Sequence, residues 1–260
     1  SQVADPLVDV TPRGNLFLNN VTFHYEGPHF PAVLSNVSVE IPEGKVTAIV
    51  GASGSGKTTL LKLLLKCYAP SEGSIEVGSQ KLSQLPTATW LSRCGVVMQD
   101  GYIFDDTVLA NITESDSERP LDKERLAHAV RIAYLEDFIH QLPNGYHTPI
   151  GQNGMGLSGG QRQRLLIARA VYKNPDYLFF DEATSALDAK SERSIVSNLE
   201  TFFQDRTVVI VAHRLSTVKH ADQIIVLDQG QVVEQGTHSD LTQQRGEYYH
   251  LVKNQLELGV

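Results

Sequence analysis

The sequence predicts an α/β fold in which a layered core carries an antiparallel β-subdomain at its N-terminal end and an inserted α-helical subdomain. Two alternating stretches rich in Val, Phe and Leu, at 15–25 and 33–41, enclose a segment with Gly and Pro, as paired strands do. Short apolar runs separated by helical patterns follow, which is typical of a layered α/β core. The strand pattern then disappears over 99–157, and this interruption indicates the insertion.

The core elements can be placed in order along the chain. An apolar, β-branched run at 45–50 ends in glycines and precedes a leucine-rich stretch at 57–66. This pattern indicates a buried strand, a loop and a buried helix. Further short buried strands are expected in five apolar runs, at 73–77, 95–98, 177–180, 207–212 and 223–227.

The insertion is predicted to be helical. The stretches 121–133 and 134–142 have helical patterns, and turn-forming residues at 143–145 close the second of them. We therefore place a helical subdomain at about 100–165.

The C-terminal third continues the alternation of strands and helices. Asp188 occupies an N-cap position, and the helix after it has one apolar face made of Ile195, Val196, Leu199, Phe202 and Phe203. A turn at 228–230 precedes an apolar segment at 231–234, which predicts a hairpin, and 239–258 is expected to be mostly helical.

The composition of the chain argues against several classes of function. The chain has 260 residues, 22 Lys and Arg against 30 Asp and Glu, and a net charge of −8, so it has no global field to attract nucleic acid. Cys67 and Cys94 have no ligand-spaced partners, so we expect two buried thiols rather than a zinc site or a disulfide. We interpret 1–14 as a linker and 15–260 as one domain, and no apolar run approaches the roughly 20 residues of a membrane-spanning helix.

A phosphate-binding loop lies between the strand at 45–50 and the helix at 57–66. Its glycines allow backbone N–H groups to point at phosphate oxygens, and the helix N-terminus adds positive potential. Lys57 is expected to reach the terminal phosphates, and the Thr58 hydroxyl to ligate Mg²⁺. The nucleotide-binding residues predicted here are Gly51, Ser53, Gly54, Ser55, Gly56, Lys57, Thr58 and Thr59.

Two acids follow the apolar run at 177–180. Asp181 ends a predicted strand, where a carboxylate can hold Mg²⁺ beside a phosphate loop. Glu182 can orient or deprotonate the attacking water. The alternative is an ordinary pair of strand-end carboxylates. The sequence has no Asn-Lys-x-Asp guanine reader, so ATP with Mg²⁺ is preferred to GTP.

A second Gly-rich segment lies at the start of a predicted helix. Leu157, Ser158, Gly159, Gly160 and Gln161 precede a helical stretch and could bind another anion. In their position between the phosphate loop and Asp181 they resemble the signature motif of the ATP-binding cassette (ABC) ATPases. The resemblance covers about 15–258, and it implies the nucleotide-binding domain of that family, built on a phosphate-loop NTPase core.

The resemblance implies roles for further residues. Tyr25 matches the aromatic residue that stacks on adenine, Gln99 the glutamine that contacts Mg²⁺ and the attacking water, and His213 the histidine at the γ-phosphate. Each residue taken alone would more often be a packing or solvated side chain. The loop at 185–188 matches the segment that crosses to a second subunit, and the family pattern makes Ser158, Gly159, Gly160, Gln161 and Asp188 contacts to nucleotide across that dimer.

These matches complete the predicted site. The implied catalytic residues are Lys57, Gln99, Glu182 and His213, and the implied metal ligands are Thr58, Gln99 and Asp181.

Finer resemblance points to the exporter branch of the family. The stretches 99–107, 111–112 and 142–146 resemble cassettes fused behind six transmembrane helices, whereas Pro149 and Gln152 stand where the family usually has glutamates. The resemblance implies a head-to-tail partner cassette, identical or not, a transmembrane domain fused upstream or separate, and a place at the cytoplasmic face of a membrane. The alternatives are a soluble cassette acting on nucleic acid or ribosomes, an importer subunit, or a regulatory module without hydrolysis.

Overall fold

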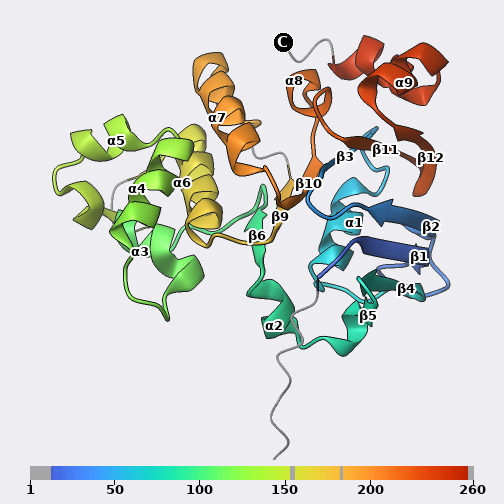
Figure 1. Ribbon diagram of the computed structural model, residues 1–260, viewed down its shortest axis with the longest axis horizontal. Helices are drawn as coiled ribbons and strands as arrows, with labels where there is room; N and C mark the ends of the chain where they lie inside the picture. Colours follow the sequence, from blue (N-terminus) through green and yellow to red (C-terminus); the bar gives the residue numbers. More distant parts are fainter. Residues whose placement is uncertain (1–12, 153–155, 182–183, 257–260) are drawn as a thin grey trace, which may run out of the picture.

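The computed structural model describes residues 13–152, 156–181 and 184–256 (Figure 1). An antiparallel sheet has the order β2-β1-β4-β5, and its strands are β1 (Leu16–Phe23), β2 (Leu34–Ile41), β4 (Glu72–Val77) and β5 (Gln80–Lys81). A six-stranded sheet has the order β12-β11-β3-β10-β9-β6. Its strands are β3 (Val46–Gly51), β6 (Cys94–Val97), β9 (Tyr177–Asp181), β10 (Thr207–Val211), β11 (Gln223–Asp228) and β12 (Gln231–Gly236).

The predicted β-subdomain and core are confirmed, with one strand reassigned. The run at 73–77 was expected in the core, but β4 pairs antiparallel with β1, with Leu16 opposite Val77. Only alternate side chains of β4 are buried at its C-terminal half, because one face of this sheet is open to solvent. In the larger sheet all pairs are parallel except β11 with β12, which form the predicted hairpin.

The two faces of the six-stranded sheet pack against different helices. Alternate residues of the central strands enter two separate hydrophobic clusters, as in β9, where Phe179 enters one and Phe180 the other. Helix α1 (Lys57–Leu64) packs in the cluster that contains Phe179. Helices α6 (Gly159–Tyr172) and α7 (Ala189–Phe202) pack in the cluster that contains Phe180. Thus α1 and α6 cover opposite faces of the sheet (Figure 1).

The insertion is helical, as predicted, with one local exception. It contains α3 (Val108–Thr113), η2 (Glu114–Asp116), α4 (Lys123–Ile132), α5 (Glu136–Gln141) and η3 (Gly145–His147). The expectation of no strand over 99–157 was wrong, since β7 (Asp106–Thr107) pairs with β8 (Pro149–Ile150). Two-residue strands leave no periodic pattern in a sequence.

The remaining helices are short. They are η1 (Leu82–Gln84), α2 (Thr87–Leu91), α8 (Leu215–Val218), α9 (His238–Gln244), α10 (Glu247–Leu251) and the π-helical turn η4 (Val252–Leu256). The predicted N-cap of α7 is confirmed, because the Asp188 side chain accepts a hydrogen bond from the Ser191 N–H. Among the described residues, no helix combines the length and apolar character needed to cross a membrane.

One cysteine prediction was wrong. Cys94 is buried at the start of β6, but Cys67 is exposed. The chain leaves α1 at Lys66, which has a positive φ of 61°, and this turn places Cys67 outside the apolar face of the helix.

Candidate functional site

The phosphate-binding loop joins β3 to α1, as the sequence predicts. Gly51 ends β3 where a Cβ atom would lie 2.3 Å from the carbonyl oxygen of Leu227, so only glycine fits. Gly54 and Gly56 have φ values of 79° and 103°, which favour glycine. The loop therefore wraps tightly and ends at the N-terminus of α1, and a helix N-terminus favours an anion through its backbone N–H groups and positive potential.

Lys57 lies inside this loop. Only 6% of its surface is exposed, and its Nζ donates to the carbonyl oxygens of Gly51 at 2.7 Å and Ala52 at 2.9 Å. The buried Ser55 hydroxyl lies 3.4 Å from the same Nζ. These contacts hold the ammonium group of Lys57 against the predicted phosphate-binding loop.

Thr58 and Asp181 meet although they are far apart in sequence. Thr58 Oγ1 donates to Asp181 Oδ2 at 3.0 Å, and Asp181 is 3% exposed. A hydroxyl and a carboxylate oxygen at this separation form a donor set that suits Mg²⁺, which prefers hard oxygen ligands. The structure thus brings together two of the three predicted metal ligands.

Tyr25 lies over the first turn of α1. Its hydroxyl and Thr59 Oγ1 are 2.7 Å apart, and its ring makes edge contacts with Phe23 and Tyr68 at centroid distances of 4.9 and 5.2 Å. Tyr25 as a whole remains 46% exposed. An exposed aromatic ring beside the phosphate loop can stack on a base, which is the role predicted for Tyr25.

The strand register places Gln99 and His213 at the same sheet edge as Asp181. Val97 of β6 pairs with Phe180, and Val211 of β10 pairs with Asp181. Gln99 and His213 each follow their strand by two residues, and both are exposed. Because the carboxyl ends of parallel strands meet at one edge, Gln99 and His213 follow the two strands that lie on either side of the strand ending in Asp181. Glu182 lies outside the described residues, so its predicted role stays a prediction.

The signature residues form the N-terminus of α6. Ser158 Oγ accepts from the Gln161 N–H at 3.1 Å, and Gln161 Oε1 accepts from the Ser158 N–H at 2.9 Å. This capping box engages both side chains locally. A Cβ at Gly159 would lie 3.3 Å from the Cβ of Ala186, so the first turn of α6 packs closely on the loop after β9.

That loop is fixed from two sides. Gln163 Nε2 donates to Ser185 Oγ at 3.0 Å, and Gln163 Oε1 accepts from the Ala186 N–H at 2.9 Å. Arg214, next to His213, donates to the Ser185 carbonyl oxygen at 3.3 Å and also pairs with Glu192.

Asp188, a predicted nucleotide contact, caps α7 in this structure. Its hydrogen bonds to Ser191 lower the pKa of its carboxyl group. The cap keeps the carboxylate charged at the start of the helix, and a contact of Asp188 with nucleotide stays a prediction.

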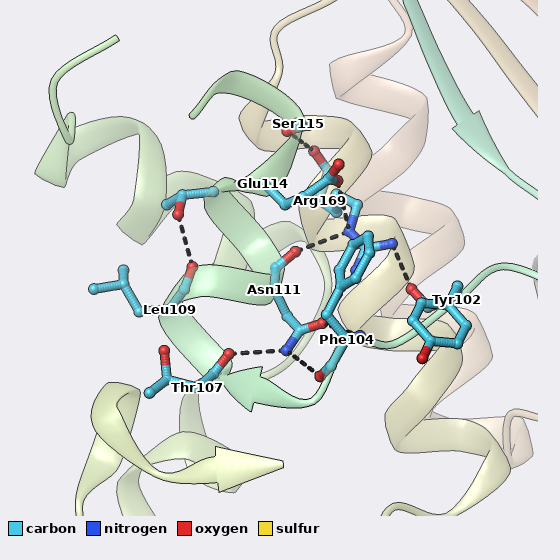
Figure 2. Close-up of polar contacts among 9 residues, drawn as sticks. Tyr102, Phe104, Thr107, Leu109, Asn111, Glu114, Ser115 and Arg169 are labelled. Atoms are coloured by element: carbon cyan, nitrogen blue, oxygen red, sulfur yellow. Dashed lines mark hydrogen bonds and ion pairs between the residues drawn. The ribbon is translucent and has the colours of Figure 1, made fainter. Parts of the chain in front are cut away.

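The structure also shows residues that sequence reasoning missed. Asn111 is 1% exposed, accepts from the Phe104 N–H at 2.8 Å, and donates to the carbonyl oxygens of Phe104 and Thr107 (Figure 2). Arg169 of α6 donates to the carbonyl oxygens of Tyr102 and Asn111, each at 2.8 Å. In the sequence Asn111 is only part of the family pattern at 111–112, and no local signal identifies a partner about 60 residues away.

Comparison with known proteins identifies the family. A family model described as ABC transporter matches residues 34–185. The chain belongs to the ABC transporter family. The membership predicted from the signature motif is therefore confirmed.

Two relatives of this ABC transporter chain are ATP-binding proteins for leukotoxin translocation, LktB of Mannheimia haemolytica and of Bibersteinia trehalosi, and each is 47% identical over 247 residues. The match covers 95% of this chain and 34% of each relative, so the chain spans about a third of their length. A solved bacterial Atm1-family ABC exporter with ATP bound has a TM-score of 0.88 and 38% identity, and the match covers 97% of this chain and 44% of that one. The predicted fold is thereby confirmed.

Proposed function

We propose that this chain is the ATP-binding and ATP-hydrolysing motor domain of an ABC exporter. The observation that carries the proposal is the pairing of Thr58 Oγ1 with Asp181 Oδ2 at the mouth of a loop that encloses Lys57. The ATP-bound exporter that shares the fold supports the choice of nucleotide and of branch. The leukotoxin relatives support export, since their names describe translocation.

Each residue has a physical task in this proposal. The loop N–H groups and Lys57 bind the β- and γ-phosphates, and Tyr25 stacks on adenine. Thr58, Asp181 and Gln99 would hold Mg²⁺, which when bound neutralises charge on the terminal phosphates. Glu182 orients or deprotonates the attacking water, while His213 donates to the γ-phosphate as charge develops on it.

The proposed active unit is a head-to-tail dimer of cassettes. Lys57 begins α1 and Ser158 caps α6, and these two helices cover opposite faces of the sheet. This arrangement supports a nucleotide held between the phosphate loop of one cassette and the signature N–H groups of another, with two-fold symmetry. Binding of ATP then favours the closed pair, and hydrolysis releases it.

A transmembrane domain would convert this cycle into transport. We propose that it is fused upstream or provided as a separate subunit, and that this domain, at 15–260 with a helical subdomain at about 100–165, lies at the cytoplasmic face of the membrane. The net charge of −8 argues against nucleic acid as the partner.

The variant Glu182→Gln tests the proposed chemistry. Removal of the general base should lower the rate of phosphate release by about 10²- to 10⁴-fold while ATP binding persists, so an ATP-dependent dimer should accumulate on size-exclusion chromatography. Glu118→Gln is the matched control, because this substitution causes the same change of charge at an exposed position outside the proposed site. Full hydrolysis by the Glu182 variant would refute its role as the general base. Loss of ATP binding by this variant would refute the proposal that Glu182 acts only after ATP has bound.

A further inference from the structure

A large cavity lies between α7 and α8, on the face of the six-stranded sheet that α7 covers (Figure 1). Its volume is about 420 Å³. Phe180 of β9 and Ile210 of β10 line it from the sheet, and Leu199 and Phe203 line it from the C-terminal end of α7. Close-packed protein interiors leave few voids larger than a water molecule, so a cavity of this size is a distinct feature of the fold.

The cavity has an apolar, partly aromatic lining and a rim of mixed charge. The rings of Phe180 and Phe203 have centroids 5.5 Å apart, and both residues belong to the lining. At the rim, Glu200 is exposed, whereas Arg214 is partly exposed and pairs with Glu192. An apolar cavity offers water few hydrogen-bond partners, and a rim with both signs of charge selects neither an anion nor a cation. The lining therefore suits an uncharged, largely aromatic molecule.

One hydroxyl group in the cavity wall lacks a partner. Thr217 of α8 is part of the lining, and its Oγ1 is buried without a hydrogen-bond partner among the described residues. A buried hydroxyl left unpaired costs free energy, and such a group in a native fold calls for an explanation. Threonine in a helix has two favourable χ1 rotamers, so a rotation exchanges the places of its methyl and hydroxyl groups at the wall. A ligand with one hydrogen-bonding group would then satisfy this hydroxyl.

We propose that this cavity binds an uncharged aromatic molecule with one hydrogen-bonding group, such as a phenol, and that Thr217 pairs with that group. A volume of about 420 Å³ lies within the range of cavities that hold small-molecule ligands. The site is separate from the predicted nucleotide site, because the described residues of its lining include neither Tyr25 nor any residue of the phosphate loop.

The cavity wall also includes two segments that lead from the sheet to the predicted site. Thr184 and Ser185 follow β9, and His213 follows β10. A molecule in the cavity favours the arrangement of these segments that it contacts best. This part of the inference rests on the proposed function, in which His213 donates to the γ-phosphate. Occupancy of the cavity restrains His213 away from the γ-phosphate and thereby slows hydrolysis.

Equilibrium dialysis of the whole chain with 2-naphthol tests the site without turnover. With protein in excess we expect a Kd of about 0.1 to 1 mM, as for a ligand of about ten non-hydrogen atoms. Naphthalene lacks the hydroxyl group and should bind about 2- to 10-fold more weakly, and the anion naphthalene-2-sulfonate should bind more weakly than either. In Thr217→Val the difference between 2-naphthol and naphthalene should disappear, because this variant keeps the side-chain shape and removes the protein partner.

Two cavity-filling variants show where the probe binds. Ala221→Phe and Val196→Phe each place a ring in the cavity, from the residue after α8 and from α7, and each should raise the Kd of 2-naphthol about tenfold or more. Ala127→Phe is the matched control, because Ala127 is exposed on α4 and lies outside the lining. If Ala221→Phe does not fold, Val196→Phe carries the comparison from a partly exposed position. Tyr25→Ala should bind 2-naphthol as wild type does.

Hydrolysis measured with and without 2-naphthol tests the effect on His213. Near saturation the probe should lower kcat of the wild-type chain about fivefold and leave kcat of Ala221→Phe unchanged.

The outcomes are distinct. Equal binding of 2-naphthol by wild type and both cavity-filling variants would overturn the site, and so would loss of binding in Tyr25→Ala, which would place the probe at the predicted adenine site. Binding without any change of kcat would overturn the effect on His213. Failure of the wild-type chain to hydrolyse ATP would instead refute the proposed function, since dialysis needs no turnover.

Discussion

The contact between Tyr25 and Thr59 allows a sharp test of how the base is bound. Tyr25 is 46% exposed, whereas Thr59 is 6% exposed, and their hydroxyl oxygens are 2.7 Å apart. Tyr25→Phe keeps the ring and removes this bond. A hydrogen bond contributes about 0.5 to 1.5 kcal/mol to the free energy of unfolding, and because this one is only partly buried we expect a value near the lower end. ATP affinity should change less than about twofold, because stacking uses the ring.

Tyr25→Ala removes the ring as well. The loss of stacking is expected to weaken ATP binding by about 1 to 3 kcal/mol, which raises the Kd roughly 5- to 150-fold. Isothermal titration calorimetry with ATP measures the effect on binding, and urea unfolding measures the effect on stability. In the unfolding experiment Thr59→Val serves as control, because it removes the same hydrogen bond from the other side. Wild-type affinity in Tyr25→Ala would refute stacking. An equal loss in Tyr25→Phe would assign binding to the hydroxyl instead.

Three further predictions follow from the described contacts. Asp181→Asn should raise the Mg²⁺ concentration for half-maximal hydrolysis by about 10- to 100-fold in a metal titration, and an unchanged midpoint would contradict the proposed donor set. Asn111→Ala should lower the free energy of unfolding by about 2 to 3 kcal/mol in urea, well beyond Asn198→Ala, whose amide bonds lie nearer the surface. Ellman's reagent should react rapidly with Cys67 alone, because burial raises the pKa of the Cys94 thiol; a rapid phase surviving Cys67→Ser would disprove this.

The fold was largely predictable because its elements carry local signals. The β-branched run before Gly51, the leucines of α1 and the cap at Asp188 each specify a short segment with little help from the rest of the chain. The phosphate loop and the signature were found for the same reason, since each places its chemistry within a few consecutive residues.

The sequence-based predictions were wrong where the outcome depends on tertiary contacts. The run at 73–77 has a strand pattern, but the pattern does not say which sheet the strand joins, and its pairing with β1 places it in the smaller one. Cys67 was expected inside because it has no partner at ligand spacing, but the turn at Lys66 exposes it. Both outcomes depend on where the chain turns and on what lies beside it.

By itself the sequence determined the order of elements, the phosphate loop, the helix start at Ser158 and the family, because each is written in local spacing. Only the tertiary structure decided that Thr58 reaches Asp181, that Tyr25 contacts Thr59, and that Arg162 holds the Gln99 backbone. Such contacts join residues far apart in the chain, and they result from the packing of α1 and α6 against strands and loops that lie elsewhere in the sequence. No local pattern encodes that packing, since it depends on the summed free energy of many distant contacts.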